Sequence, residues 1–254
     1  MSRLTRSFRV SLLGAALILS ACATVEPQVA TQGISDPKET ENRQMHAFNK
    51  DVDTIVVSPV ADGYGSIVPQ PVRRSVSRFS DHLSIPNDVM NNMLQGDVGG
   101  AMHNTFRFAF NTVFGLAGFF DPATAIGVQR ADTDFGETLH KWGAPEGNYV
   151  ELPIFGPSTT RDTVGIVVDM VTDPVTVGLA APERYLGPAS YLLNKLSDRY
   201  EYDATIDSVL YESADSYAQG RSLYIQNRRF KLGITSGDAY LDPYLDPYGD
   251  TNAE

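Results

Sequence analysis

The side chains that could do covalent or metal chemistry are few in this sequence and widely separated. Cys22 is the only cysteine in 254 residues, so a thiol nucleophile or acyl acceptor exists at that one position. The four histidines, His46, His82, His103 and His140, never stand three or four residues apart on one helix, the spacing that brings two imidazoles to a metal. We therefore expect no metal site and no cofactor.

Motifs of known catalytic sites are also missing. The sequence has no G-x-S-x-G elbow, no H-E-x-x-H pair and no phosphate-binding glycine loop. Asp132-Thr133-Asp134 begins like a calcium loop, but the glycine and the distal glutamate of that loop are absent. We expect a protein that is not an enzyme and has no catalytic residue.

The residues before Cys22 give this cysteine a role. Three arginines in the first nine residues precede a short apolar run over residues 10–19, which is too short to cross a bilayer and suits a signal peptide. Leu19-Ser20-Ala21-Cys22 then resembles the lipobox of bacterial lipoproteins; an ordinary cleaved signal with an incidental cysteine is the alternative. We expect residues 1–21 to be removed and Cys22 to be acylated.

The residue after the cysteine and the net charge bear on location. Ala23, rather than aspartate, follows Cys22, which resembles an outer-membrane sorting signal in Gram-negative bacteria. Without the three leading arginines, 17 basic residues stand against 31 acidic ones, a net charge of −14. This charge argues against nucleic acid as a partner and against electrostatic adsorption to anionic lipid. Membrane contact beyond the lipid anchor should therefore be hydrophobic.

The remaining chain predicts one predominantly helical domain. Residues 22–35 read as a tether, residues 36–235 as the domain, and residues 236–254 as an acidic, proline-rich tail that we expect to be disordered. Apolar residues recur at helical spacing in short segments that proline and glycine interrupt. We expect breaks at Pro59 and at Ile85-Pro86, one strand-like piece at 149–152 within the Gly/Pro-rich stretch 143–157, and helices over 36–58, 71–85, 89–94, 97–113, 135–142, 158–172 and much of 189–231.

The helix over 97–113 has an unusually wide apolar face. Its apolar side chains cover more than half of the circumference and leave a narrow polar strip that includes His103 and Arg107. The segment 158–172 repeats this pattern, with Asp162 and Asp169 in its strip. Two interpretations are open: a helix buried between layers with one wet edge, or a helix in hydrocarbon whose polar strip faces an aqueous path.

Several motifs stand in order along the first part of the chain. They include Asp36-Pro37-x-Glu39-x-x-Asn42-Arg43, Val68-Pro69-Gln70-Pro71-Val72-Arg73, Asn91-x-x-Leu94-Gln95-Gly96, Arg107-Phe108-x-x-Asn111-Thr112, Asp134-Phe135-Gly136-x-Thr138-Leu139 and Gly147-x-Tyr149-x-x-Leu152-Pro153-x-x-Gly156-Pro157-Ser158-Thr159-x-Arg161-Asp162. These motifs resemble those of the MlaA (VacJ) family of outer-membrane lipoproteins. The resemblance covers about 36–174, with a looser fit to about 230.

The resemblance implies an all-α fold in which many short helices form a ring-shaped, membrane-embedded domain with one extended Gly/Pro-rich loop. It implies an outer-membrane protein, lipid-anchored and facing the periplasm, that removes misplaced phospholipid from the outer leaflet. The implied partners are trimeric porins and a periplasmic lipid-binding carrier protein. The direction of transport comes only from the resemblance, and the sequence does not give the preferred phospholipid.

The residues selected for this function fall into two groups. Polar residues on the two wide-faced helices are candidates for lining an amphipathic channel: His103, Arg107, Asp162 and Asp169. The family's loop that controls channel access corresponds to about 118–134. At its start, the apolar pair could dip into the bilayer or make a plain core contact, and the candidate gating residues are Phe119, Phe120, Asp121 and Pro122.

Two other functions compete with transport. One is a structural or adhesive envelope lipoprotein that binds porins without moving lipid. The other is a lipid hydrolase, which the missing nucleophile motif disfavours.

Overall fold

The structure is a computed structural model that describes residues 33–234. The expected signal peptide, Cys22, nearly all of the expected tether and the expected tail at 236–254 lie outside the described residues. The boundaries predicted for these segments stay predictions.

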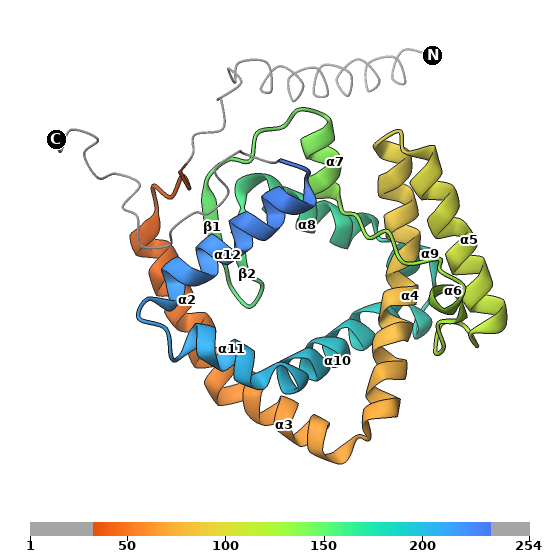
Figure 1. Cartoon of the computed structure of the whole chain (residues 1–254), viewed down its shortest axis with the longest axis horizontal. Coiled ribbons are helices and arrows are strands. Elements are labelled where there is room, and N and C mark those ends of the chain that lie inside the picture. Colours follow the sequence, from red (N-terminus) through yellow and green to blue (C-terminus); the bar gives the residue numbers. More distant parts are fainter. Residues whose placement is uncertain (1–32, 235–254) are drawn as a thin grey trace, which may run out of the picture. The chain divides into compact units, whose positions relative to one another are not determined.

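Helices dominate residues 33–234, as the sequence predicted (Figure 1). The helices are α2 (Glu39–Val52), the π-helical turn η1 (Asp53–Val57), α3 (Ser58–Ile67), α4 (Gln70–Leu94), α5 (Val98–Phe114), α6 (Pro122–Ala125), α7 (Phe135–Lys141), α8 (Thr160–Thr172), α9 (Pro174–Gly178), the 3₁₀ turn η2 (Glu183–Tyr185), α10 (Leu186–Glu201), α11 (Asp203–Leu210) and α12 (Ser216–Lys231).

One small sheet lies among the helices. The predicted strand is confirmed as β1 (Tyr149–Leu152), and it pairs antiparallel with β2 (Gly156–Thr159), with Tyr149 opposite Thr159. The hairpin turn holds Ile154 at φ 69°, a conformation that is rare for a β-branched residue. The stretch that was read as a long Gly/Pro-rich loop therefore contains an ordered hairpin.

Neighbouring elements form a closed circuit. Along it, α2 continues through η1 into α3, α3 packs on α10, α10 on α4, and α4 on α7. The circuit then runs from α7 to α8, from α8 to β1, and from β1 back to α2 (Figure 1). The ring of helices that was expected corresponds to this circuit, with α5 packed on α4.

Two predicted helix breaks are wrong, both at prolines. The chain passes Pro59 without a break, because the π-helical turn η1 lies directly before it and changes the backbone hydrogen-bond register there. Pro86 lies inside α4, which runs unbroken for 25 residues. A proline in a helix interior loses one backbone hydrogen bond, and we attribute its tolerance here to the packing of α4 against α5 and α10.

The helix starts differ from expectation by small shifts. Asp97 caps α5 as its side chain accepts from the Gly100 N–H at 2.9 Å. Thr159, rather than Ser158, caps α8. Asp36 was expected to start a helix, but α2 begins three residues later and the Asp36 carboxylate is buried. A capping side chain accepts a hydrogen bond from a free backbone N–H group in the first turn of a helix. Helices α5 and α8 therefore begin directly after Asp97 and Thr159, whose side chains reach those N–H groups.

The polarity of the fold is inverted relative to a water-soluble domain. The buried side chains are mostly polar or charged, and the few buried apolar residues are largely alanines and tyrosines. Large apolar side chains are exposed on several helices instead; on α5 they are Val98, Met102, Phe106, Val113 and Phe114. No helix in 33–234 is both long enough and apolar enough to cross a membrane.

Buried ion pairs connect distant parts of the chain. The Asp36 carboxylate accepts from Arg221 Nη1 at 2.6 Å, from Asn42 Nδ2 at 2.8 Å and from the Tyr217 hydroxyl. These bonds join the first described residues to α12. The small apolar cluster of Tyr149, Tyr217 and Ile225 packs beside them.

Arg228 of α12 forms a second group of contacts between distant segments. We call it the Arg228 clamp, and we call the contacts of Arg221 with Asp36 the Arg221 clamp. The Arg228 guanidinium donates two hydrogen bonds of 2.7 Å to Asp134 and two more to Asp162, at 2.9 and 3.1 Å. It thereby ties α12 to the start of α7 and to α8. Bidentate arginine–carboxylate pairs fix geometry as well as charge.

Removing the ion pair between Arg221 and Asp36, the Arg221 clamp, should destabilise the whole domain. We expect Arg221→Ala to lower the free energy of unfolding by about 3–5 kcal/mol, because it leaves the Asp36 carboxylate buried and uncompensated. The control is Arg74→Ala, whose exposed side chain lies 3.9 Å from Glu201 and should cost less than about 1 kcal/mol. Denaturant unfolding in detergent measures both, and equal costs would contradict a central role for the clamp.

Candidate functional site

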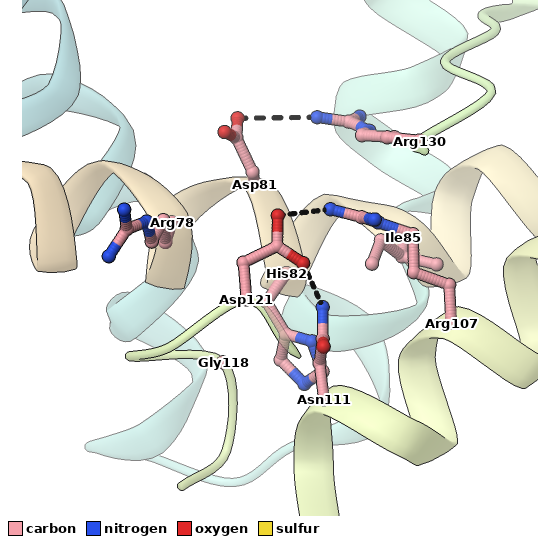
Figure 2. Close-up of a pocket in the computed structure, with 9 residues that line it drawn as sticks. All are labelled: Arg78, Asp81, His82, Ile85, Arg107, Asn111, Gly118, Asp121 and Arg130. Carbon is pink, nitrogen blue, oxygen red and sulfur yellow. Dashed lines mark hydrogen bonds and ion pairs between the residues drawn. The ribbon is translucent and has the colours of Figure 1, made fainter. Parts of the chain in front are cut away.

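A charged cavity of about 50 Å³ lies where α4, α5 and the segment after α5 meet (Figure 2). Its charged and ionisable lining residues are Arg78, Asp81, His82, Arg107, Asp121 and Arg130.

One face of α4 supplies half of these groups. Arg78, Asp81, His82 and Ile85 follow one another at the three- and four-residue spacing that places side chains on one side of a helix. The helix α4 therefore presents a cation, a carboxylate, an imidazole and an apolar side chain to the same cavity.

Arg107 and Asp121, which both line the cavity, form an ion pair with each other. Arg107 Nη2 donates to Asp121 Oδ2 at 2.6 Å, and its Nη1 donates to the Thr124 hydroxyl at 3.0 Å and to the Val128 carbonyl. Burial opposes ionisation of Asp121, but hydrogen bonds from Thr124, Asn111 and Arg107 outweigh it and lower its pKa to about 2. Asp121 is therefore a fixed anion at neutral pH.

Arg130 is shared unequally between two carboxylates. Its Nε donates to buried Asp88 at 2.8 Å, whereas its Nη1 reaches Asp81 only at 3.3 Å. Burial raises the pKa of Asp81, and the charge of Arg130 only partly offsets this effect. Asp88 is therefore the main partner of Arg130, and Asp81 is weakly compensated.

His82 lines the cavity with an uncharged imidazole ring. Its ring stacks on Phe108 at 4.5 Å, and its Nε2 lies 3.1 Å from the Thr112 hydroxyl. That hydroxyl donates to the Phe108 carbonyl at 2.7 Å, so Nε2 must carry the proton, and Nδ1 is a buried acceptor without a hydrogen-bond partner among residues 33–234. Burial and the charge of Arg107 lower the pKa of His82, which fits an uncharged imidazole.

Gly118 closes the cavity from the side of the loop. Its φ is +93°, and a Cβ built there would lie 2.3 Å from the His82 ring. A residue with any side chain would therefore both strain the backbone and collide with the imidazole.

The two α5 candidates for channel lining meet the same segment of chain. His103 is exposed, and its Nε2 lies 2.6 Å from the Gln129 carbonyl, while Arg107 is buried in the cavity wall. Asn104 lies between them and donates to the Ala131 carbonyl at 2.8 Å. One polar edge of α5 thus holds the segment that was interpreted as a gating loop.

The two α8 candidates contact other elements. Asp162 is buried in the Arg228 clamp and also accepts from the Tyr224 hydroxyl at 2.8 Å. Asp169 is half-buried and accepts from Asn87 and Asn91 of α4 and from the Phe135 N–H, all within 3.0 Å. The structure does not bring these two aspartates to the cavity.

The predicted gating residues lie between α5 and α6. Phe119 stacks on Phe79 of α4 with ring centroids 4.6 Å apart, yet 42% of it remains exposed, and Phe120 is 51% exposed. Asp121 caps the short helix α6, which begins at Pro122 and was expected to be loop. The start of the segment is therefore held on α4 and on α5.

Sequence reasoning missed Arg78, Asp81, His82 and Arg130 as members of one site. The α4 residues could have been grouped by their helical spacing. The prediction of a break at Pro86 and the long separation between α4 and Arg130 hid the cavity.

The charged and polar groups that line this cavity can bind a ligand through ionic contacts and hydrogen bonds. Arg107, Asp121 and Arg130 are held in ion pairs, whereas Arg78 has no ion pair within residues 33–234. Within the same residues, no set of three or more His, Cys, Asp or Glu side chains could hold a metal ion. A helical domain with ionic contacts inside, apolar side chains outside and a charged cavity belongs to the class of membrane-associated proteins that bind lipid.

The comparisons with known proteins agree with that class. Residues 34–231 match the family model described as MlaA lipoprotein, and this chain belongs to that family. It is 35% identical over 86% of its length, and 85% of the relative, to the intermembrane phospholipid transport system lipoprotein MlaA of Escherichia coli (strain K12). The protein of the same name from Haemophilus influenzae is 32% identical over 90% of this chain and 91% of the relative.

A solved structure is also similar to the chain. It comes from work on the structural basis for maintenance of bacterial outer membrane lipid asymmetry. The TM-score is 0.67 at 30% sequence identity, over 78% of this chain and 99% of the other. The expected fold and family are thereby confirmed.

Arg107 and Asp121 should prove energetically coupled. We expect Arg107→Ala and Asp121→Asn each to cost about 3 kcal/mol of unfolding free energy, and the double variant to cost 1–3 kcal/mol less than their sum. A cycle on the exposed Lys195–Asp198 pair, 3.3 Å apart, should show coupling below about 1 kcal/mol. Additive costs at Arg107 and Asp121, measured by denaturant unfolding, would show that the pair does not hold the loop.

Proposed function

We propose that this chain is an outer-membrane lipoprotein that removes misplaced phospholipid from the outer leaflet. It passes the lipid through an amphipathic channel to a periplasmic lipid carrier and thereby maintains the lipid asymmetry of the membrane. Membership of the MlaA lipoprotein family supports this proposal, as do the names of the relatives.

The observation that carries the proposal is the inverted polarity of the fold. Side chains such as Met102, Phe106 and Phe114 on α5 are half or more exposed, whereas Arg107 and Asn104 on the same helix are buried. In water the exposed apolar side chains would favour aggregation, but in the hydrocarbon of a membrane they contact acyl chains. The helices therefore suit a position within one leaflet, with their charged groups kept away from the acyl chains.

The proposed lipid path uses the polar strips of the wide-faced helices. Arg107 is the favoured lining residue, because it faces the charged cavity beside the segment at 118–134. His103, Asp162 and Asp169 remain proposed lining residues, though each is engaged in contacts that hold helices together. The segment starting at Phe119, Phe120, Asp121 and Pro122 is the proposed gate.

The remaining parts of the proposal concern location and partners. Cys22 would carry acyl chains that sort the protein to the outer membrane, where it faces the periplasm. Trimeric porins would hold it in place and a soluble carrier would accept the lipid. The protein would leave the lipid chemically unchanged, since the site has no activated nucleophile.

Deleting the gene in its host should disturb the outer leaflet. We expect more phospholipid on the cell surface and greater detergent sensitivity, both restored by the wild-type gene on a plasmid. Unchanged surface phospholipid would favour the structural or adhesive lipoprotein instead. Release of fatty acid from labelled phospholipid by the purified chain would point to a hydrolase.

The lipid anchor should be dispensable once the protein is in the membrane. We expect protein cut between Cys22 and Asp36 to stay in the membrane fraction, because the domain exposes its own apolar side chains. A protease site inserted in that segment tests this by fractionation, with uncut protein as the control. Full release into the soluble fraction would show that the acyl chains on Cys22 alone hold the protein in the membrane.

A further inference from the structure

Two charged side chains on the cavity face of α4 are left poorly compensated. Arg78 is exposed and makes no ion pair or hydrogen bond within residues 33–234. Asp81 has a side chain that is 53% exposed, and its one ion pair in the described part of the chain is the 3.3 Å contact with Arg130. Figure 2 shows Arg78 apart from the other groups and Asp81 turned toward Arg130.

These two residues could have paired with each other but do not. They stand three positions apart on one helix, a spacing at which opposite charges reach each other. Within residues 33–234, the structure instead holds a cation without an ion pair and a weakly held anion side by side on one cavity. An occupant that carries both charges would satisfy both side chains.

The other charges around the cavity are already balanced. Arg107 pairs with Asp121 at 2.6 Å, Arg130 pairs with Asp88 at 2.8 Å, and His82 is neutral. Among the charged groups of residues 33–234 that line the cavity, a ligand with a net negative charge would find only Arg78 without an ion pair. Such a ligand would also offer no positive group to the Asp81 carboxylate. The charge pattern therefore fits a zwitterion better than an anion.

We propose that Arg78 and Asp81 form a head-group subsite for zwitterionic phospholipid, with Arg78 on the phosphodiester and Asp81 on a primary amine. This inference rests on the proposed function, because it names the lipid that the same protein prefers. The cavity of about 50 Å³ has room for about four water-sized groups, the scale of an aminoethyl group.

An apolar contact for the acyl chains lies beside the subsite. Phe79 follows Arg78 in α4 and stacks on Phe119, which follows Gly118 of the cavity wall. Both Phe119 and Phe120 keep large exposed areas. A lipid with its head group at Arg78 and Asp81 could therefore lay its acyl chains along these rings.

The test compares two lipids that differ only in the head group. The purified full-length chain in detergent is equilibrated with equal amounts of phosphatidylethanolamine and phosphatidylglycerol of identical acyl chains, and bound lipid is quantified by mass spectrometry. We expect about fivefold more bound phosphatidylethanolamine, the size of one partly exposed ion pair. Asp81→Asn should bring the ratio close to one, and Arg78→Ala should lower the binding of both lipids.

Matched controls separate the subsite from general charge effects. Asp62→Asn on α3 and Arg74→Ala on α4 alter exposed charges outside the cavity and should leave both amount and ratio unchanged. Circular dichroism melting checks that every variant is folded. Water-soluble glycerophosphoethanolamine should not displace the lipid at equal concentration; displacement would assign the site to a soluble phosphate ester and overturn the lipid assignment.

The outcomes distinguish the two proposals. Binding of both lipids without preference by the wild type, or a preference that survives Asp81→Asn, overturns the head-group subsite and leaves the transport function intact. A wild-type chain that binds no phospholipid at all contradicts the proposed function itself.

Discussion

The fold depends on buried ion pairs between arginines and carboxylates. Because the large apolar side chains lie on the outside, the hydrophobic effect that normally gathers a core has little to bury here. Contacts such as Arg221 with Asp36 and Arg228 with Asp162 supply directional cohesion in its place. Each pair is strong only while it is complete, since an unpaired buried charge costs several kcal/mol.

The candidate site belongs to the same network. The pair of Arg107 and Asp121 holds the segment after α5, and the pair of Arg130 and Asp88 holds its end against α4. These contacts leave a cavity whose walls are fixed and whose rim keeps Arg78 and Asp81 available. A rigid wall with two available charges is suited to recognising a head group, because little ordering is needed when the ligand binds.

Much of the fold could be predicted from local pattern, but the grouping of Arg107 and Asp121 with the α4 residues and Arg130 in one cavity could not. The period of apolar residues placed α5 almost to the residue, and the strand at 149–152 was placed correctly. Pro86 misled because packing around α4 outweighs the local cost of a proline. The ion pairs join residues as far apart as Asp36 and Arg221, and one sequence carries no signal of which opposite charges meet.

The arginines of α12 have a consequence for how the chain is made. Asp36, Asp134 and Asp162 precede their shared partner helix, which is the last helix of the described chain. Until residue 221 has been synthesised, Asp36 lacks its arginine partner, and until residue 228 has been synthesised, Asp134 and Asp162 lack Arg228. A chain that ends before α12 can therefore form the pair of Arg107 and Asp121 but cannot tie Asp36 and the α7–α8 region together.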